Sequence, residues 1–225
     1  MGERINIATS GTQCIGAYVA KAQGTPQGGI VVVQEIFGVN AHIRAVADRF
    51  AALGYTAIAP AFFDHVESNV ELDYGDDAFK RGRALVSEIP FDKAIEDVAS
   101  AAESISSSGK IGVVGYCWGG TVALLSATRL AMPSVSYYGA RNTGFLGEKL
   151  RAPVQFHFGE KDASIPPEAV HKHREAYPDT EVYTYPSAGH AFNRDVDPAH
   201  YDPSSAKLAL ERTLAFFAKH LGKAG

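Results

Sequence analysis

A cysteine flanked by glycines is the residue of this sequence best placed to act as a nucleophile. Cys117 lies in the run GYCWGG, residues 115–120, after a β-branched apolar run and before an apolar segment of helical period, residues 121–130. This is the context of a nucleophile elbow, a strained strand-to-helix turn that requires small residues on both sides. A thiol there lies at a helix N-terminus, where unpaired N–H groups favour the thiolate. The pattern predicts a catalytic cysteine, with an ordinary strand-to-helix turn as the alternative.

A cysteine nucleophile needs a base, and the sequence offers eight histidines. His190 follows the last expected strand and precedes the last expected helix, which is where histidine lies in enzymes with this elbow. His171 and His173 lie in a charged helical segment and are expected at the solvated surface. His157 stands between two phenylalanines and is expected in the core, while His42 is expected on a helix face. No context supports a catalytic role for His65, His200 or His220.

The carboxylate that orients such a histidine is expected between nucleophile and histidine in chain order, at the end of a strand. Asp162 fits, because it follows the run VQFHF and precedes a helix that begins with proline. A turn or N-cap aspartate is the alternative. Asp179 and Asp195 fit the order or the topology less well. No pair of histidines has metal-ligand spacing with a nearby acid, so no metal site is expected.

Two backbone amides are expected to stabilise the oxyanion that forms when the nucleophile attacks a carbonyl. One is the N–H of Trp118, the residue after the cysteine. The other comes from the loop after an earlier strand, residues 34–38, where Ile36 is the expected donor. The indole of Trp118 is expected either to line the pocket or to pack against the next strand.

These residues can meet only if strands and helices alternate regularly. Short β-branched runs do alternate with segments of helical period, which predicts an α/β fold with a mostly parallel sheet flanked by helices. The expected strands are residues 17–22, 29–34, 56–59, 111–115, 135–138, 154–158 and 181–185. The expected helices are residues 41–53, 121–130 and 206–221, the last with an apolar face formed by Leu208, Leu210, Leu214, Phe217 and Leu221. Residues 62–74 are expected to form an acidic loop where substrate enters.

Length and composition limit the classes of protein that remain. The 225 residues suffice for one large core, so a single domain over residues 1–225 is expected. The net charge is −4, and charged residues of both signs are mixed along the chain. No basic stripe is formed, so nucleic acid is not an expected partner. The apolar runs are far shorter than the ~20 residues of a membrane-spanning helix, and the N-terminus carries no apolar signal segment. Neither a membrane partner nor secretion is therefore expected.

The number of cysteines indicates the cellular compartment in which the chain is expected. They are too few for a disulfide framework in a chain of this length, so a cytoplasmic location is expected. Cys14 lies in a stretch rich in glycine and threonine and is expected to be a small packed residue.

Four sequence blocks contain most of these candidates. They are QEIFGVN at 34–40, GVVGYCWGG at 112–120, GEKD at 159–162 and AGHAFNR at 188–194. In this order, and over nearly the whole chain, they resemble the dienelactone hydrolase family. The resemblance implies an α/β-hydrolase fold with a Cys-His-Asp triad at Cys117, His190 and Asp162. It also implies hydrolysis of lactones or activated esters without a metal or organic cofactor.

The resemblance implies two further roles that spacing alone does not give. Glu35 would pair with the resting thiol and help to ionise it, whereas by position alone a solvated or salt-bridged carboxylate is the more common reading. Arg194 would bind a substrate carboxylate through its guanidinium group, which suits bidentate contact. The alternative for Arg194 is a salt bridge with Asp195 or Asp197.

Three positions depart from the family's pattern. Gly75 and Phe79 stand where the type members have a second carboxylate-binding arginine and a tyrosine, and Arg81 or Arg83 would have to replace that arginine. Ala191 stands where a serine is expected after the histidine. Dienelactone itself is therefore not expected as the natural substrate, although the reaction type is unaffected. The residues expected to line the substrate site are Phe37, Phe79, Ala191 and Arg194.

We therefore expect a cysteine-dependent hydrolase whose partner is a small ester or lactone, acting as a monomer or a homodimer. A second hypothesis keeps the triad but assigns aryl esters, thioesters or phosphotriesters to an apolar pocket, for which Phe62, Phe63 and Phe79 are suitable. A third hypothesis, from another class, is a catalytically silent ligand-binding or interaction module, because a fold does not prove a function.

Overall fold

The computed structural model of the chain describes residues 2–9 and 14–222. Its elements belong to two compact units. The first comprises Met1–Val113 and Leu221–Gly225, and the second comprises Val114–His220. The expectation of a single domain remains a prediction.

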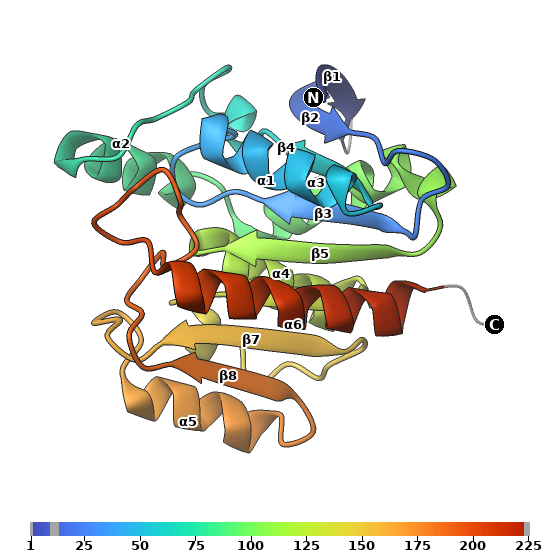
Figure 1. Cartoon of the computed structure of the whole chain (residues 1–225). Coiled ribbons are helices and arrows are strands. Elements are labelled where there is room, and N and C mark those ends of the chain that lie inside the picture. Colours follow the sequence, from blue (N-terminus) through green and yellow to red (C-terminus); the bar gives the residue numbers. More distant parts are fainter. Residues whose placement is uncertain (1, 10–13, 223–225) are drawn as a thin grey trace. The chain divides into compact units, whose positions relative to one another are not determined.

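The first unit contains four strands. They are β1 (Glu3–Ala8), β2 (Cys14–Ala20), β3 (Gly29–Val33) and β4 (Thr56–Pro60), in the order β1-β2-β4-β3 (Figure 1). β2 pairs antiparallel with both β1 and β4, whereas β3 and β4 are parallel. Every residue of β3 and β4 is buried, as expected for continuous apolar runs in a parallel pair. The loop that follows β3 carries several of the predicted site residues.

Helices follow these strands in the first unit. They are α1 (Ala41–Ala52), the 3-10 helix η1 (Phe62–His65), α2 (Asp76–Ser87), α3 (Phe91–Ser104) and the 3-10 helix η2 (Ser106–Ser108). α1 begins where the Asn40 side chain accepts a hydrogen bond from the Ile43 N–H at 3.3 Å. α2 passes very close to the loop after β3, because a Cβ at Gly82 would lie 1.9 Å from the carbonyl oxygen of Ile36. Only glycine fits at that crossing.

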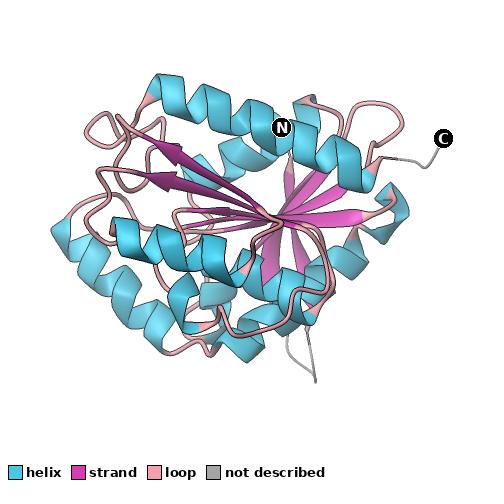
Figure 2. Ribbon diagram, turned by 90° about the horizontal axis from the view of Figure 1, so that it is seen from below, coloured by secondary structure: helices cyan, strands magenta, loops and turns pink. Residues whose placement is uncertain are grey.

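The second unit contains parallel strands with helices between them. Its elements are the second half of β5 (Ile111–Tyr116), α4 (Trp118–Arg129), β6 (Ser134–Tyr137), the 3-10 helix η3 (Asn142–Gly144), β7 (Val154–Gly159), α5 (Pro167–Ala176), β8 (Glu181–Tyr185) and α6 (Pro203–Leu221). β7 pairs in parallel with β6 on one side and with β8 on the other. Figure 2 shows strands with helices packed beside them. Parallel strands place their carboxyl ends at one edge, so the loops after β7 and β8 lie side by side.

α4 is the most deeply buried helix among the described residues, since every residue from Trp118 to Thr128 is buried. A helix that is apolar on all sides is typical of the core of a large protein. β7 is also fully buried, and its Phe156 and Phe158 rings stack at 5.9 Å. The helix after the predicted elbow and the strand before the predicted carboxylate are therefore both part of the core.

The predicted α/β class is confirmed, and each predicted strand and helix is present with ends that differ by at most three residues. The sequence pattern does not predict β1, α2 or α3. β1 buries only Ile7, and α2 buries only Gly82, Leu85 and Val86, so their apolar periodicity is weak. Half of the residues that α3 buries are alanines, which give little hydrophobic signal.

Three smaller expectations are wrong. Leu208 is 41% exposed, because α6 buries instead the row of Ala206, Ala209 and Thr213 with the phenylalanines after it. Cys14 is exposed at the first residue of β2 rather than packed. The expected loop over residues 62–74 begins with η1, which buries two phenylalanines.

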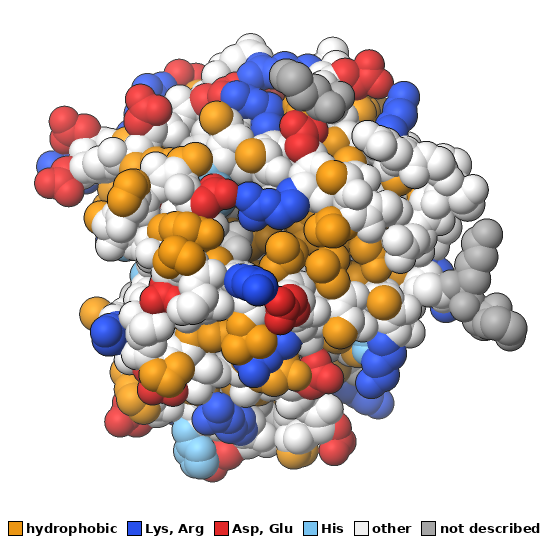
Figure 3. Space-filling view, in the orientation of Figure 1, with side chains coloured by type: hydrophobic (Ala, Val, Ile, Leu, Met, Phe, Trp, Pro, Cys, Tyr) orange, Lys and Arg blue, Asp and Glu red, His pale blue; other side chains and the backbone are white. Residues whose placement is uncertain are grey.

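The surface carries both signs of charge. Figure 3 shows Lys and Arg side chains interspersed with Asp and Glu side chains over the face that it draws. Among the residues that the structure describes, no helix is long and apolar enough to cross a membrane.

Candidate active site

Cys117 lies at the turn between β5 and α4, where the sequence predicts it. Its φ is 56° and its ψ is −115°, a conformation that non-glycine residues rarely adopt, so the backbone is strained there. The Cys117 N–H donates to the carbonyl of Tyr137 at 3.0 Å, and the Gly120 N–H donates to the carbonyl of Cys117 at 2.9 Å. These bonds to β6 and α4 hold the strained residue in place.

The glycines around Cys117 are required by close backbone contacts. A Cβ at Gly115 would lie 1.8 Å from the carbonyl oxygen of Gly119. A Cβ at Gly120 would lie 2.5 Å from the carbonyl oxygen of Tyr137. The glycine spacing that marks the motif in the sequence is therefore a steric requirement of this turn.

Asp162 and His190 meet although they lie on different loops. Nδ1 of His190 is 2.7 Å from Oδ2 of Asp162. The two loops are joined where the Lys161 N–H donates to the carbonyl of Ala188 at 2.9 Å. A Cβ at Gly159 would lie 2.5 Å from that same carbonyl oxygen. The parallel ends of β7 and β8 and a glycine thus bring the carboxylate to the imidazole.

Cys117 and Asp162 together determine the charge of His190. Burial lowers the pKa of the His190 imidazole, but the electrostatic interaction with the neighbouring Cys117 and hydrogen bonds with Asp162 and Cys117 outweigh it and raise the pKa to about 10. The structure therefore brings all three predicted triad residues together within the second unit.

Asp162 keeps its charge although its side chain is only 1% exposed. Burial raises the pKa of this carboxyl group, but the hydrogen bond and charge of His190 and two hydrogen bonds from Ser164 outweigh it, so the pKa is lowered. The alternative of a simple turn aspartate does not account for the contact with His190.

Two residues at this site are not predicted from the sequence. Ser164 donates its N–H and its hydroxyl to Oδ1 of Asp162, at 2.9 and 2.5 Å. Tyr138, at a φ of 40° after β6, places its ring centroid 5.1 Å from that of His190. A serine two residues after an aspartate is a common turn pattern, so it gives no catalytic signal in a sequence.

Arg194 has the salt bridge that the sequence leaves open as its alternative. Its Nη1 donates to Oδ2 of Asp197 at 3.0 Å, and the same oxygen lies 2.7 Å from Nδ1 of His200. Burial raises the pKa of Asp197, but the hydrogen bonds from Arg194 and His200 and their charges outweigh it, so the pKa is lowered. The guanidinium is buried, with part of its charge already balanced.

The other predicted residues of the second unit flank these groups in the chain. Trp118 is the first residue of α4 and is buried. Ala191 is buried at a φ of 60°, a conformation that is rare for residues with a Cβ. Its carbonyl accepts the Arg194 N–H at 2.9 Å, which forms a tight turn between the histidine and the arginine.

The remaining predicted residues lie in the first unit. Glu35, Ile36 and Phe37 follow β3 and are all buried, and the Phe37 ring packs edge-on against Tyr74 at 4.9 Å. Phe79 on α2 is 48% exposed. Their expected roles at the substrate remain predictions.

The two arginines considered as replacements for the missing anion-binding arginine also lie on α2. Arg81 donates to Oε1 of Glu67 at 2.6 Å. The Arg83 guanidinium lies 5.8 Å from the centroid of the Phe79 ring. Both arginines therefore have partners within their own unit.

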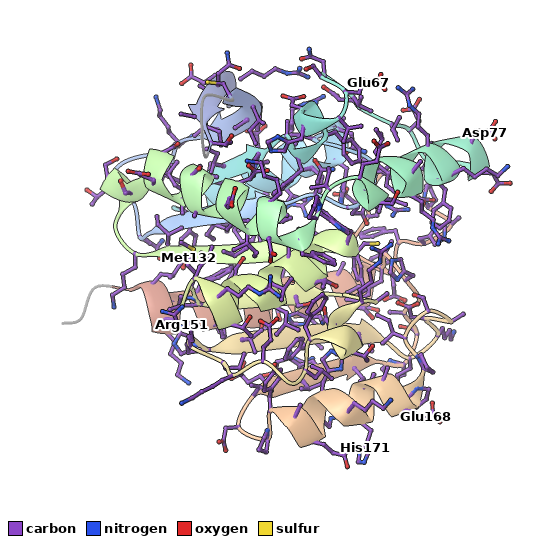
Figure 4. The ribbon with its side chains drawn as sticks, turned by 180° about the vertical axis from the view of Figure 1, so that it is seen from behind. Glu67, Asp77, Met132, Arg151, Glu168 and His171 are labelled. Atoms are coloured by element: carbon purple, nitrogen blue, oxygen red, sulfur yellow. The ribbon has the colours of Figure 1, made fainter. Side chains whose placement is uncertain are left out.

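Of the histidines outside the triad, one is placed wrongly by the sequence. His173 is buried, and its Nδ1–H donates to the carbonyl of Ala169 at 2.7 Å. It packs against Phe156 and Phe158, because its face of α5 is turned to β7. His171 points away from the unit near Glu168, as Figure 4 shows.

His157 is buried in the core, as expected. Its Nδ1 lies 2.7 Å from the hydroxyl of Tyr185, and its Nε2 lies 2.8 Å from Oε1 of Gln155. Burial, with the charge of Arg212, lowers the pKa of His157 to about 3, so the ring is neutral.

Among the described residues there is no group of three His, Cys, Asp or Glu side chains that could hold a metal ion.

Comparison with known proteins gives consistent matches over nearly the whole chain. The model of the dienelactone hydrolase family matches residues 15–221. The carboxymethylenebutenolidase of Pseudomonas putida is 32% identical over 227 residues, which cover 96% of this chain and 96% of that protein. A protein of Azospirillum brasilense, provisionally given the same name, is 36% identical over 231 residues, which cover 97% of this chain and 99% of that protein.

A solved structure supports the same conclusion for the fold. A crystal structure from Klebsiella pneumoniae, provisionally described as a dienelactone hydrolase, matches with a TM-score of 0.86 at 32% identity, covering 97% of this chain and 98% of that chain. The predicted α/β-hydrolase fold is therefore confirmed.

Proposed function

Since the chain belongs to the dienelactone hydrolase family, we propose that this hydrolase cleaves small lactones or activated esters with Cys117 as its nucleophile. The observation that supports the proposal is that His190 contacts both Asp162 and Cys117, with Nδ1 2.7 Å from Oδ2 of Asp162. Because Nδ1 is occupied by the carboxylate, Nε2 is the nitrogen that exchanges a proton with the thiol. This is the arrangement that a Cys-His-Asp triad needs.

The reaction follows from these positions. Sγ of Cys117 attacks the carbonyl carbon, and the carbonyl π electrons move to the oxygen. When the tetrahedral intermediate collapses, the bond to the ester oxygen breaks and His190 donates its proton to that oxygen. Water, deprotonated by His190, then attacks the acyl-thioester and releases the carboxylic acid and the thiol. Asp162 stabilises the imidazolium in both steps and remains ionised.

The N–H of Trp118 is the proposed oxyanion donor within the second unit. It lies directly after the nucleophile at the N-terminus of α4, where the helix dipole favours negative charge. Glu35 and Ile36 complete the proposal through the family resemblance, Glu35 as a group that helps His190 to ionise the thiol and Ile36 as the second amide donor.

We propose the substrate class from the names of the relatives and from the anion-binding residues that this chain lacks. Lactones come first, because the relatives are named as carboxymethylenebutenolidases. Arg194 is the proposed contact for a substrate carboxylate, with Phe37, Phe79 and Ala191 lining the site. A neutral aryl ester is the second candidate. It is favoured by the salt bridge of Arg194 to Asp197 and by Gly75 and Phe79 at the positions of the missing clamp.

The experiment that tests the proposal is alkylation of the protein with iodoacetamide while hydrolysis of a panel of lactones and aryl esters is followed. Activity is expected to fall in proportion to alkylation of Cys117, measured by mass spectrometry. Substrate present in excess should protect Cys117 but not the exposed Cys14. Complete alkylation of Cys117 without loss of activity would contradict the proposal. Absence of hydrolysis over the whole panel would favour the ligand-binding module.

A further inference from the structure

Ser164 holds one oxygen of Asp162 with two hydrogen bonds. Its N–H lies 2.9 Å and its hydroxyl oxygen 2.5 Å from Oδ1 of Asp162. The other carboxylate oxygen, Oδ2, is left to accept the Nδ1–H of His190 at 2.7 Å. The hydroxyl oxygen of Ser164 is also only 3.3 Å from Nδ1 of His190. Ser164 therefore contacts both of the groups that the proposed mechanism places behind the nucleophile.

We propose that the hydroxyl of Ser164 is a positioning group of the active site, which fixes the rotation of the Asp162 carboxylate and so holds the proton of His190 on Nδ1. The proposal rests on the proposed function for its effect on catalysis, because Ser164 acts only through Asp162 and His190. Its effect on the proton itself is independent of any substrate.

The physical reason lies in the freedom of a carboxylate. Rotation about the last bond of an aspartate is a soft sp³–sp² torsion, so one hydrogen bond to histidine does not fix the plane of the group. Two donors on Oδ1 define that plane and point Oδ2 at the imidazole. The Asp162 side chain is only 1% exposed in the wild type, so its orientation depends on donors from the protein.

The hydroxyl can be separated from the turn in which it lies. A purely structural serine would stabilise the turn after β7, and for that the N–H bond to Oδ1 suffices. Alanine keeps this N–H bond and removes only the hydroxyl. Ser164 is exposed, so loss of the hydroxyl leaves no cavity in the core.

The chain provides a matched control at the start of α6. Ser204 lies two residues after Asp202, is exposed, and donates its hydroxyl to Oδ1 of Asp202 at 2.8 Å. The same oxygen accepts the Ser205 N–H at 2.8 Å, which caps the helix. Ser204→Ala thus removes the same type of bond at the same spacing, from an aspartate whose carboxylate is bonded by the serines at the start of the helix.

The test compares Ser164→Ala, Ser164→Thr and Ser204→Ala with the wild type. In the resting enzyme the proton on Nδ1 of His190 is followed by its downfield NMR signal and its rate of exchange with water. In turnover, kcat, KM and the pH profile are measured with the best ester of the panel. Ser164→Ala is expected to speed exchange of this proton and to lower kcat by about three- to tenfold with KM unchanged.

The pH profile gives the signature that a structural role would not. A hydroxyl donor lowers the pKa of Asp162, so its loss should move the acid limb of the profile to higher pH. Ser164→Thr should restore the wild-type exchange rate and profile, and Ser204→Ala should retain them. If Ser164→Ala folds poorly, Ser164→Val and Ser164→Thr form an isosteric pair that isolates the hydroxyl.

Unchanged proton exchange and an unchanged acid limb in Ser164→Ala would overturn the proposal. A loss of activity in Ser164→Ala that is explained by a lower Tm alone would also overturn the proposal. The same holds if Ser204→Ala loses activity to the same extent. Failure of the proposed function has a different signature, because it would show as hydrolysis that persists in Cys117→Ala while the exchange of the His190 proton is still sensitive to Ser164.

Discussion

Nδ1 of His190 donates to Oδ2 of Asp162 across 2.7 Å, although 28 residues separate them in the chain. Asp162→Asn would keep the size of this side chain but remove its charge. In the free enzyme the asparagine amide would favour the His190 tautomer that carries its proton on Nε2. A nitrogen that already carries a proton cannot take the thiol proton. We expect kcat to fall by about 10³- to 10⁴-fold. Far-UV circular dichroism and Tm should change little, and a variant with more than a tenth of wild-type kcat would exclude a triad role for Asp162.

The buried Arg194 allows a test of whether the substrate is charged. If it binds a carboxylate, Arg194→Ala should lose about 2–4 kcal/mol of transition-state binding for acidic lactones, roughly 30- to 1,000-fold in kcat/KM. Neutral esters should be hydrolysed almost as before. Because the comparison is between two substrates of one variant, general destabilisation cancels.

Arg174→Ala is the control for that experiment, since Arg174 is an exposed arginine of the same unit. It should affect neither class of substrate. Equal losses for acidic and neutral substrates in Arg194→Ala would mean that the arginine only supports the turn with Asp197, and the neutral aryl-ester substrate would then be preferred.

Glu35→Gln tests the role that the family resemblance gives to the buried carboxylate after β3. A neutral amide cannot accept the thiol proton, so we expect lower activity and a pH profile of kcat/KM that moves to higher pH. The measurement is kcat/KM from pH 5 to pH 10 for the variant and the wild type. Superimposable profiles would leave Glu35 with a structural role alone.

Burial of His157 predicts a loss of stability in acid. Its pKa is about 3 in the folded chain against an ordinary value of 6.5, so between these values the unfolded chain binds a proton that the folded chain does not. Stability from this group is present above pH 6.5 and is lost as the pH falls toward 3. The free energy of unfolding should decrease through this group by up to about 1.4 kcal/mol per pH unit.

Urea unfolding at pH 7.5 and pH 4.5 measures this effect. His157→Gln should be less stable at pH 7.5 but should lose less stability on acidification than the wild type. His171→Gln is the control, because His171 is exposed on α5. If the two variants have the same pH dependence, His157 is not the group responsible.

The contact between Asp162 and His190 could be predicted from the sequence because it depends on order and spacing. Where strands and helices alternate, consecutive parallel strands are expected to be neighbours, so Asp162 and His190 can be placed together without knowledge of any side-chain rotamer. At Gly115 a Cβ would collide with the neighbouring backbone, so this position requires glycine. Glycines of this kind mark the elbow directly in the sequence.

The parts that the sequence does not predict depend on packing or on a single rotamer. His173 is buried because one face of a charged helix packs against Phe156 and Phe158, and charge composition alone suggested the opposite. Ser164 takes part only because its hydroxyl turns to Asp162, and a turn serine looks the same in sequence whichever way it points. α2 has too few buried positions for its period to be visible.

The most direct test of the account is kcat/KM for Cys117→Ala on the best lactone or ester of the panel, with Cys14→Ala as the control. Alanine removes the thiol and little volume, so both variants should fold with near wild-type Tm. We predict that Cys117→Ala loses about 10⁴-fold or more of the activity, since the nucleophile is gone, whereas Cys14→Ala retains it. Wild-type activity in folded Cys117→Ala would contradict the central claim that this chain is a cysteine-dependent hydrolase.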